Sequence, residues 1–206
     1  MAAPSLYGLV LAGGASRRMQ TDKAALAYHG KSQLAWSYEL LAKFTEKCFV
    51  SVRPDQRADP VRAGFPQIVD TQPGIGPIAG ILAALQTHPS HPWLVLACDL
   101  PFLTEDTLRH LIAHRDAAKL ATAYRSTHDG LPEPLCAIWE PASREPLQSW
   151  LQSEQRCPRK FLITSAAALV DASEPAALDN INTPEEYRAS QSSLSTGRTM
   201  GSKQSV

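Results

Sequence analysis

Short apolar runs alternate with helical patterns along most of this chain. The runs at residues 7–12, 48–52, 67–70 and 93–99 are typical of buried strands, and apolar residues at helical spacing follow the first, third and fourth of them. Strands that alternate with helices predict a mostly parallel, twisted sheet with helices on both faces. We therefore expect an α/β fold in three layers.

Several expected helices have recognisable first residues. Ser32 and Thr104 are suited to N-caps, and Pro77 is suited to a first helical turn. Further helices are expected at residues 144–153 and 158–165, and from Thr183, where Pro184 and Glu186 complete a helix-start pattern.

The second half of the chain leaves the sheet topology open. Residues 120–125 and 133–140 are strand candidates joined by a short polar link, and residues 167–173 are a candidate final strand. The first two either pair antiparallel or are joined by a crossover. The spacing alone does not decide between these arrangements.

The length and the composition favour one domain. A chain of 206 residues is near the upper end of what a single core contains. From residue 189 onward the chain is Ser-rich and nearly free of apolar residues, so it buries too little surface to offset the entropy of ordering. We expect a single domain over residues 1–188 and a disordered tail over residues 189–206.

The charge and the cysteine content limit which kinds of partner and which cellular compartment we expect. The formal net charge is +0, whereas a protein that grips nucleic acid along many phosphates usually has a basic excess. No run is apolar enough over its length for a membrane span or a signal peptide. The four cysteines are far apart, which is unlike a zinc set or a disulfide framework. We expect a cytoplasmic protein with no nucleic-acid partner and no membrane contact.

The stretch LVLAGGASRRMQTDKAAL joins a buried strand to a basic segment. Gly13 and Gly14 allow backbone conformations that point successive N–H groups at an anion, and Arg17, Arg18 and Lys23 add full positive charges. This pattern predicts a loop that binds phosphate. A glycine turn followed by a solvated basic loop is an equally good interpretation of these residues alone.

Two aspartates follow buried strands. In a parallel α/β sheet, ligands bind beyond the carboxyl ends of the strands, where Asp70, Asp99 and the Gly13–Gly14 loop are all expected to lie. Mg²⁺ typically takes one or two carboxylates together with substrate phosphates, so Asp99 is a candidate metal ligand. A helix cap or a loop hydrogen bond is the structural alternative for either aspartate.

Two further segments contain turn-forming residues. Residues 73–80, PGIGPIAG, form either a rigid turn or a close backbone approach to a base or a ribose. Asn180 and Asn182 precede an expected helix and are more typical of turns and caps than of ligand contacts.

Four segments occur together in an order that resembles a known family. LVLAGGASRRMQTDKA, DTQPGIGPIAGILAAL, LACDLPFL and NINTPEEY are similar in order and spacing to the molybdenum cofactor guanylyltransferases, the MobA-like nucleotidyltransferases. The resemblance extends from Tyr7 to Tyr187. It implies a Rossmann-like three-layer sandwich of the nucleotidyltransferase type. The implied substrates are Mg-GTP and Mo-molybdopterin, and the products are the guanine dinucleotide form of the cofactor and pyrophosphate.

The resemblance also implies roles for individual residues. Asp99 matches the Mg²⁺ ligand, and Arg17 and Lys23 join it as catalytic candidates that offset charge on the phosphates. The nucleotide contacts match Leu11, Ala12, Gly13, Gly14, Lys23, Asp70 and Asp99. The molybdopterin side matches Asn180 and Asn182, with Arg159 and Lys160 as candidate phosphate ligands or, equally, as a solvated helix face.

Two positions depart from the family pattern, and several functions remain open. Gln20 stands where the family usually has glycine, and Ser51 stands where it commonly has asparagine. The alternatives to guanylyl transfer are a molybdopterin cytidylyltransferase, a sugar-1-phosphate nucleotidyltransferase and a non-catalytic nucleotide-binding module. Molybdenum-insertion proteins or target molybdoenzymes are the implied protein partners.

Overall fold

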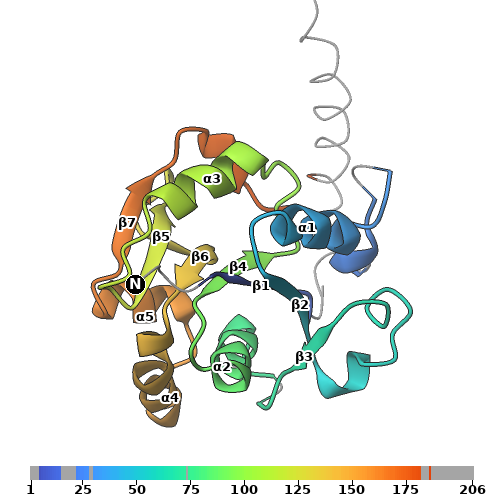
Figure 1. Ribbon diagram of the computed structural model, residues 1–206, viewed down its shortest axis with the longest axis horizontal. Coiled ribbons are helices and arrows are strands. Elements are labelled where there is room, and N and C mark those ends of the chain that lie inside the picture. Colours follow the sequence, from blue (N-terminus) through green and yellow to red (C-terminus); the bar gives the residue numbers. More distant parts are fainter. Residues whose placement is uncertain (1–4, 15–21, 28–29, 73, 182–185, 187–206) are drawn as a thin grey trace, which may run out of the picture.

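The computed structural model describes residues 5–14, 22–27, 30–72, 74–181 and 186, and these residues form one seven-stranded sheet. The strand order is β3-β2-β1-β4-β6-β5-β7 (Figure 1). The strands are β1 (Tyr7–Leu11), β2 (Lys47–Val52), β3 (Gln67–Val69), β4 (Trp93–Ala97), β5 (Ala121–Arg125), β6 (Pro132–Trp139) and β7 (Ala168–Asp171).

The sheet is mostly parallel, as the alternating pattern predicted. Strands β3, β2, β1 and β4 are parallel neighbours, and β5 and β7 are also parallel. Strand β6 is antiparallel to both β4 and β5. The two strand candidates whose pairing the sequence left open therefore form an antiparallel pair through the short link between them.

Helices cover both faces of the sheet, which makes the three expected layers. In Figure 1, α1 and α3 lie on one side of the sheet and α2, α4 and α5 on the other. The helices are α1 (Gln33–Ala42), α2 (Pro77–Thr87), α3 (Glu105–Ala113), α4 (Arg144–Gln152) and α5 (Pro158–Thr164). Short 3₁₀ turns are η1 (Lys23–Ala25), η2 (Pro54–Gln56), η3 (Pro141–Ser143) and η4 (Pro175–Leu178).

The helix starts that the structure describes follow the sequence signals. Ser32 Oγ accepts a hydrogen bond from the Ala35 N–H at 3.2 Å, and Thr104 Oγ1 accepts one from Thr107 at 3.2 Å. Pro77 is the first residue of α2, where its missing N–H costs no hydrogen bond. The pattern at Thr183 and the expected tail at 189–206 lie outside the described residues.

The core consists of two apolar layers, one on each face of the sheet. The layer under α1 and α3 includes Val10, Leu34 and Leu108, and the other includes Leu9 and Ile81. All five of these side chains are essentially inaccessible to solvent, and each contributes roughly 1.5–3 kcal/mol relative to exposure. Successive residues of β1 thus anchor opposite helical layers and fix where that strand ends.

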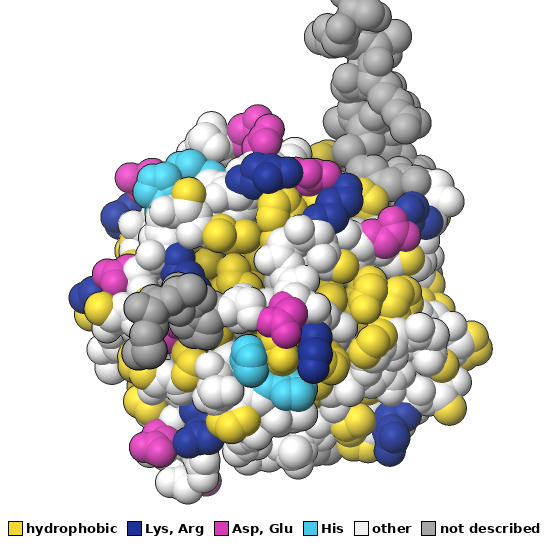
Figure 2. All heavy atoms as spheres, viewed as in Figure 1, with side chains coloured by type: hydrophobic (Ala, Val, Ile, Leu, Met, Phe, Trp, Pro, Cys, Tyr) yellow, Lys and Arg dark blue, Asp and Glu magenta, His cyan; other side chains and the backbone are white. Residues whose placement is uncertain are grey.

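Two further observations concern the distribution of surface charge and the lengths of the helices. On the face drawn in Figure 2, basic and acidic side chains are interspersed with apolar ones, so this face shows no continuous track for a polyanion. In the described part of the chain, every helix is too short or too polar to cross a bilayer.

Candidate functional site

A cavity of about 500 Å³ opens beyond the carboxyl ends of β1, β3 and β4. The chain runs from β1 to β2 on one side of the sheet and returns to place β4 on the other side of β1. The cavity therefore lies where the strand order reverses, which is the usual ligand position in an open α/β sheet. Seven residues predicted from the sequence line it: Leu11, Ala12, Gly13, Gly14, Lys23, Asp70 and Asp99.

Lys23 and Asp99 form an ion pair in the cavity wall. Lys23 Nζ lies 2.9 Å from Asp99 Oδ2, and the two side chains are 17% and 21% exposed. Lys23 is held by η1, whose N-cap Asp22 accepts a hydrogen bond from the Ala24 N–H at 3.1 Å. Asp99 follows β4 and the buried residue Cys98. The fold thus places a cation and a carboxylate from two separate elements at one point of the cavity.

Asp70 lines the cavity directly after β3 and is almost fully buried. Burial raises the pKa of its carboxyl group, and the Ser51 hydrogen bond and the Arg53 charge oppose that rise. Ser51 Oγ donates to Asp70 Oδ1 at 2.7 Å. The serine at the position where the family commonly has asparagine therefore orients one oxygen of this aspartate. A Cβ atom on Gly13 would lie 3.5 Å from the other oxygen, Oδ2, so Gly13 and Asp70 are close neighbours.

Arg53 is a cavity residue that the sequence did not single out. Its Nη1 donates to the Gly13 carbonyl, and its Nε and Nη2 each donate to Asp55 at 3.1 Å. The guanidinium thereby supports the glycine loop from the end of β2. A position directly after a predicted strand was the available signal, since strand ends at this edge face the ligand site.

Backbone atoms form the wall of the cavity near the start of α2. Gly74 and Gly76 both have φ of 91°, a conformation that favours glycine, and both line the cavity with Pro77. Both interpretations of residues 73–80, a rigid turn and a close backbone approach to a base or a ribose, are compatible with this conformation. Without a Cβ, these glycines let a flat group come near the main chain.

Among the described residues that line the cavity, Cys98 is the only cysteine. Burial raises the pKa of its thiol to about 12. A thiol that stays protonated at neutral pH is a weak nucleophile. The site therefore gives no support for covalent catalysis through this residue.

The remaining predicted residues are placed differently. The Ile181 N–H donates to the Asp99 carbonyl at 3.1 Å, which holds the exposed Asn180 beside the metal candidate. Arg159 lies 2.9 Å from both Asp129 and Glu133, and Lys160 is exposed. Within the described chain, the cavity lining includes none of Asn180, Arg159 and Lys160. Arg17, Arg18, Gln20 and Asn182 lie outside the described residues.

The carboxylate of Asp99 fits a magnesium ion whose remaining ligands come from the substrate and water. Among the residues that the structure describes, no three His, Cys, Asp or Glu side chains gather as a metal site. Mg²⁺ is commonly bound by one or two carboxylates with water and substrate phosphates supplying the other oxygens. A single hard carboxylate beside a lysine and a glycine loop matches that requirement.

A mostly parallel sheet with a glycine loop, a lysine and a strand-end carboxylate around one switch-point cavity is typical of nucleotide-binding α/β proteins. Comparison with known families agrees: the profile of the MobA-like NTP transferase domain matches residues 8–169. The chain belongs to this family. The family is one of nucleotidyltransferases.

Individual relatives are similar to this chain over most of its length. The chain is 38% identical over 182 residues to a molybdenum cofactor biosynthesis bifunctional protein of Synechocystis. The matched region covers 88% of this chain but only 52% of the longer relative. It is 32% identical to a molybdenum cofactor guanylyltransferase of Cereibacter sphaeroides, over 92% of this chain and 97% of the relative. The crystal structure of a molybdopterin-guanine dinucleotide biosynthesis protein A from Archaeoglobus fulgidus is similar, with a TM-score of 0.78 and 25% identity. That similarity covers 93% of this chain and all of the other.

Proposed function

We propose that the protein transfers GMP from GTP to Mo-molybdopterin in the presence of Mg²⁺, giving molybdopterin guanine dinucleotide and pyrophosphate. The observation that carries this proposal is the Lys23–Asp99 pair, which lines the switch-point cavity together with Gly13. The Cereibacter sphaeroides relative, matched over nearly its whole length, supports guanylyl transfer as the reaction.

In the proposed reaction, an oxygen of the molybdopterin phosphate attacks the α-phosphorus of GTP in line with the leaving group. A new oxygen–phosphorus bond forms, the bond between the α-phosphorus and the bridging oxygen breaks, and pyrophosphate leaves with that electron pair. The attacking phosphate is already anionic, so no general base is required. Positioning and charge neutralisation then supply most of the catalysis, as in phosphoryl transfer generally.

The chain's own residues divide this work. Lys23 and the Gly13 and Gly14 amides bind the β- and γ-phosphates, and Arg17 is assigned to the same task. Asp99 would hold Mg²⁺, which when bound neutralises phosphate charge. Asp70 orients the nucleoside end through the carboxylate oxygen nearest Gly13.

The molybdopterin side is assigned to Asn180 and Asn182, with Arg159 and Lys160 further out. Arg159 would have to exchange its contacts with Asp129 and Glu133 for a substrate phosphate. A cytoplasmic location and transfer of the product to an insertion protein or a molybdoenzyme belong to the same proposal.

The direct test is product formation by the purified protein. Incubation with Mg-GTP and Mo-molybdopterin should yield the guanine dinucleotide, identified by mass, together with one pyrophosphate per turnover. Preference for CTP would indicate a cytidylyltransferase, and turnover with a sugar 1-phosphate would indicate the other nucleotidyltransferase class. Tight GTP binding without pyrophosphate release would indicate a binding module and overturn the proposal.

Asp99→Asn separates the metal assignment from the fold. The variant should lose at least about a hundredfold in turnover, because it removes the proposed metal ligand. Asp106→Asn is a matched control, since Asp106 is an exposed aspartate in the first turn of α3. Turnover of Asp99→Asn within threefold of the wild type would contradict the assignment.

A further inference from the structure

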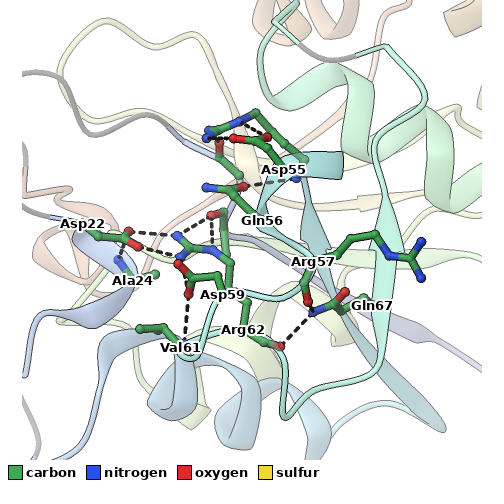
Figure 3. Close-up of polar contacts among 12 residues, drawn as sticks. Asp22, Ala24, Asp55, Gln56, Arg57, Asp59, Val61, Arg62 and Gln67 are labelled. Carbon is green, nitrogen blue, oxygen red and sulfur yellow. Dashed lines mark hydrogen bonds and ion pairs between the residues drawn. The ribbon is translucent and has the colours of Figure 1, made fainter.

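Arg62 is a charged side chain that is almost completely buried. It lies in the segment between β2 and β3, and its relative exposure is 1%. Removing a guanidinium from water is unfavourable unless partners replace its hydration. Figure 3 shows Asp22 and Asp59 converging on this side chain.

The five N–H groups of the guanidinium are matched by five contacts. Nε and Nη2 donate to the Ala12 carbonyl at 3.0 and 2.9 Å. Nη1 and Nη2 donate to the Asp22 carboxylate at 2.6 and 2.8 Å, and Nη1 lies 3.1 Å from Asp59 Oδ1. The N–H groups on both edges of the planar guanidinium therefore have acceptors, a geometry that a lysine does not reproduce.

Two of these partners belong to the cavity. Ala12 follows β1 and precedes Gly13, and Asp22 is the N-cap that starts η1 and precedes Lys23. Both Ala12 and Asp22 line the cavity, whereas Arg62 lies behind it. One guanidinium thus joins the chain before the glycine pair to the chain before the phosphate lysine, 10 residues apart along the sequence.

The charge balance is consistent with this link. Burial works to raise the pKa of Asp22, but the hydrogen bonds from Arg62 and Ala24 outweigh it, and the pKa is lowered. Asp22 is therefore held as an anion at the edge of a cavity assigned to a polyphosphate. The Arg62 charge offsets that anion, which would otherwise repel phosphate.

We propose that Arg62 is a positioning residue for nucleotide transfer: it fixes Lys23 and Gly13 relative to each other through Asp22 and Ala12. This inference rests on the proposed function. It assigns Arg62 no contact with substrate, since its donors are occupied by the protein. A purely structural ion pair is the alternative, because buried pairs also occur far from active sites.

The test compares Arg62→Met with Arg115→Met. Arg115 is the matched control because it also forms a largely buried pair, with Glu140 at 2.6 and 2.8 Å, in a part of the described fold outside the cavity lining. At a temperature well below both melting points, Arg62→Met should raise the KM for GTP and the Kd for Mg-GTP at least tenfold. Arg115→Met should change both by less than twofold. Unchanged KM and Kd in folded Arg62→Met would overturn the proposal.

A double-mutant cycle with Lys23→Ala identifies the route of the effect. If Arg62 acts through Lys23, then adding Arg62→Met to Lys23→Ala should weaken Mg-GTP binding by less than threefold more. Fully additive losses would contradict that route. If Arg62→Met does not fold, Arg62→Lys replaces it, and an intermediate Kd is expected because lysine keeps the charge without the fork.

Amide hydrogen exchange keeps this proposal distinct from the proposed function. The Ala24 and Ala25 N–H groups bond to Asp22, so their exchange should be at least tenfold faster in Arg62→Met and unchanged in Arg115→Met. Absence of pyrophosphate release by the wild type would refute the proposed reaction without altering this result. Unchanged exchange in Arg62→Met would refute the link itself.

Discussion

Asp70 illustrates how a single residue can favour ligand binding at the expense of stability. Burial raises its pKa, so the folded chain prefers the protonated carboxyl group more strongly than the unfolded chain does. The stability that this group contributes is therefore fully present below its unfolded pKa of about 3.8 and is lost as pH rises through the folded value. At neutral pH the ionised form is a cost to the fold.

Asp70→Asn should accordingly stabilise the protein at pH 7. The amide keeps an oxygen to accept the Ser51 hydrogen bond and carries no charge to desolvate. Its advantage over the wild type should shrink as the pH falls toward 4, because the wild-type carboxyl group is then increasingly protonated. Urea denaturation of both proteins at the two pH values measures this difference, and a variant that is less stable than the wild type at pH 7 would contradict it.

Function and stability should move in opposite directions in that variant. A hydrogen bond to a charged acceptor contributes roughly 1.5–3 kcal/mol, so Mg-GTP should bind at least about tenfold more weakly to Asp70→Asn.

Ser51→Ala is the contrasting change, since it keeps the Asp70 carboxylate and removes the hydroxyl that donates to it. It should destabilise the fold by about 1–3 kcal/mol.

The site residues differ in how well the sequence predicts them. The rule that ligands bind at strand ends was sufficient to bring Gly13, Asp70 and Asp99 together, because each lies within two residues of the end of an apolar strand. No local pattern indicates Arg62, which is 40 residues from Asp22 and 50 from Ala12 in sequence. Contacts of that kind depend on the tertiary arrangement of an irregular segment.

At the scale of single elements, α4 and α5 end in the same motif. After α4, the Glu154 N–H donates to Leu151 and the Gln155 N–H to Trp150. After α5, Ala166 occupies the position that Glu154 occupies after α4. The φ value is 59° at Glu154 and 49° at Ala166. These are Schellman ends in which glycine is the usual residue at the left-handed position.

Glu154→Gly and Ala166→Gly should therefore each stabilise the protein. Relief of the left-handed strain outweighs the added flexibility of the unfolded chain, for a net gain of about 0.5–1 kcal/mol. Melting temperatures should rise by about 1–4 °C, and the two effects should add because the sites are separate. Ser149→Gly, within α4, is the control and should lower stability by about 0.5–1 kcal/mol. A loss of stability in both left-handed variants would contradict this account.

The packing of α2 on β2 depends on the absence of a side chain at Gly80. A Cβ atom there would overlap Ser51 Oγ and lie 3.0 Å from Ser51 Cβ. Gly80→Ala should destabilise the protein by about 1–3 kcal/mol even though alanine is the better helix former, because α2 must shift or Ser51 must turn away from Asp70. Gly64→Ala is the control, since its Cβ would meet no atom within 4 Å. Equal stability of the two variants would argue against this close approach.

Elements were predictable where local chemistry specifies them. The caps at Ser32 and Thr104 and the proline at the start of α2 marked three helices correctly. The pairing of β5 with β6 was not predictable, because a short link fits a hairpin while the apolar pattern also fits strands joined by a crossover. Antiparallel register of β6 with both β4 and β5 decides it in the structure.

At the scale of the whole molecule, the candidate site belongs to no single element. Its walls come from the ends of β1, β3 and β4, from η1 and from the start of α2. These pieces meet only in the folded sheet, so a ligand bound there binds the native chain and not the unfolded one. Such a ligand raises stability by mass action.

Mg-GTP should therefore raise the melting temperature by an amount set by its affinity. At a concentration one hundred times its Kd, the gain is about 2.7 kcal/mol, which corresponds to roughly 5–10 °C for a chain of this size. Excess EDTA should remove most of the shift if Asp99 binds GTP through a metal ion, and Asp99→Asn should show little shift in either condition. An equal shift with and without EDTA would mean that GTP binds without the metal. In that case the charge of Lys23, rather than the carboxylate of Asp99, would dominate the affinity of the site.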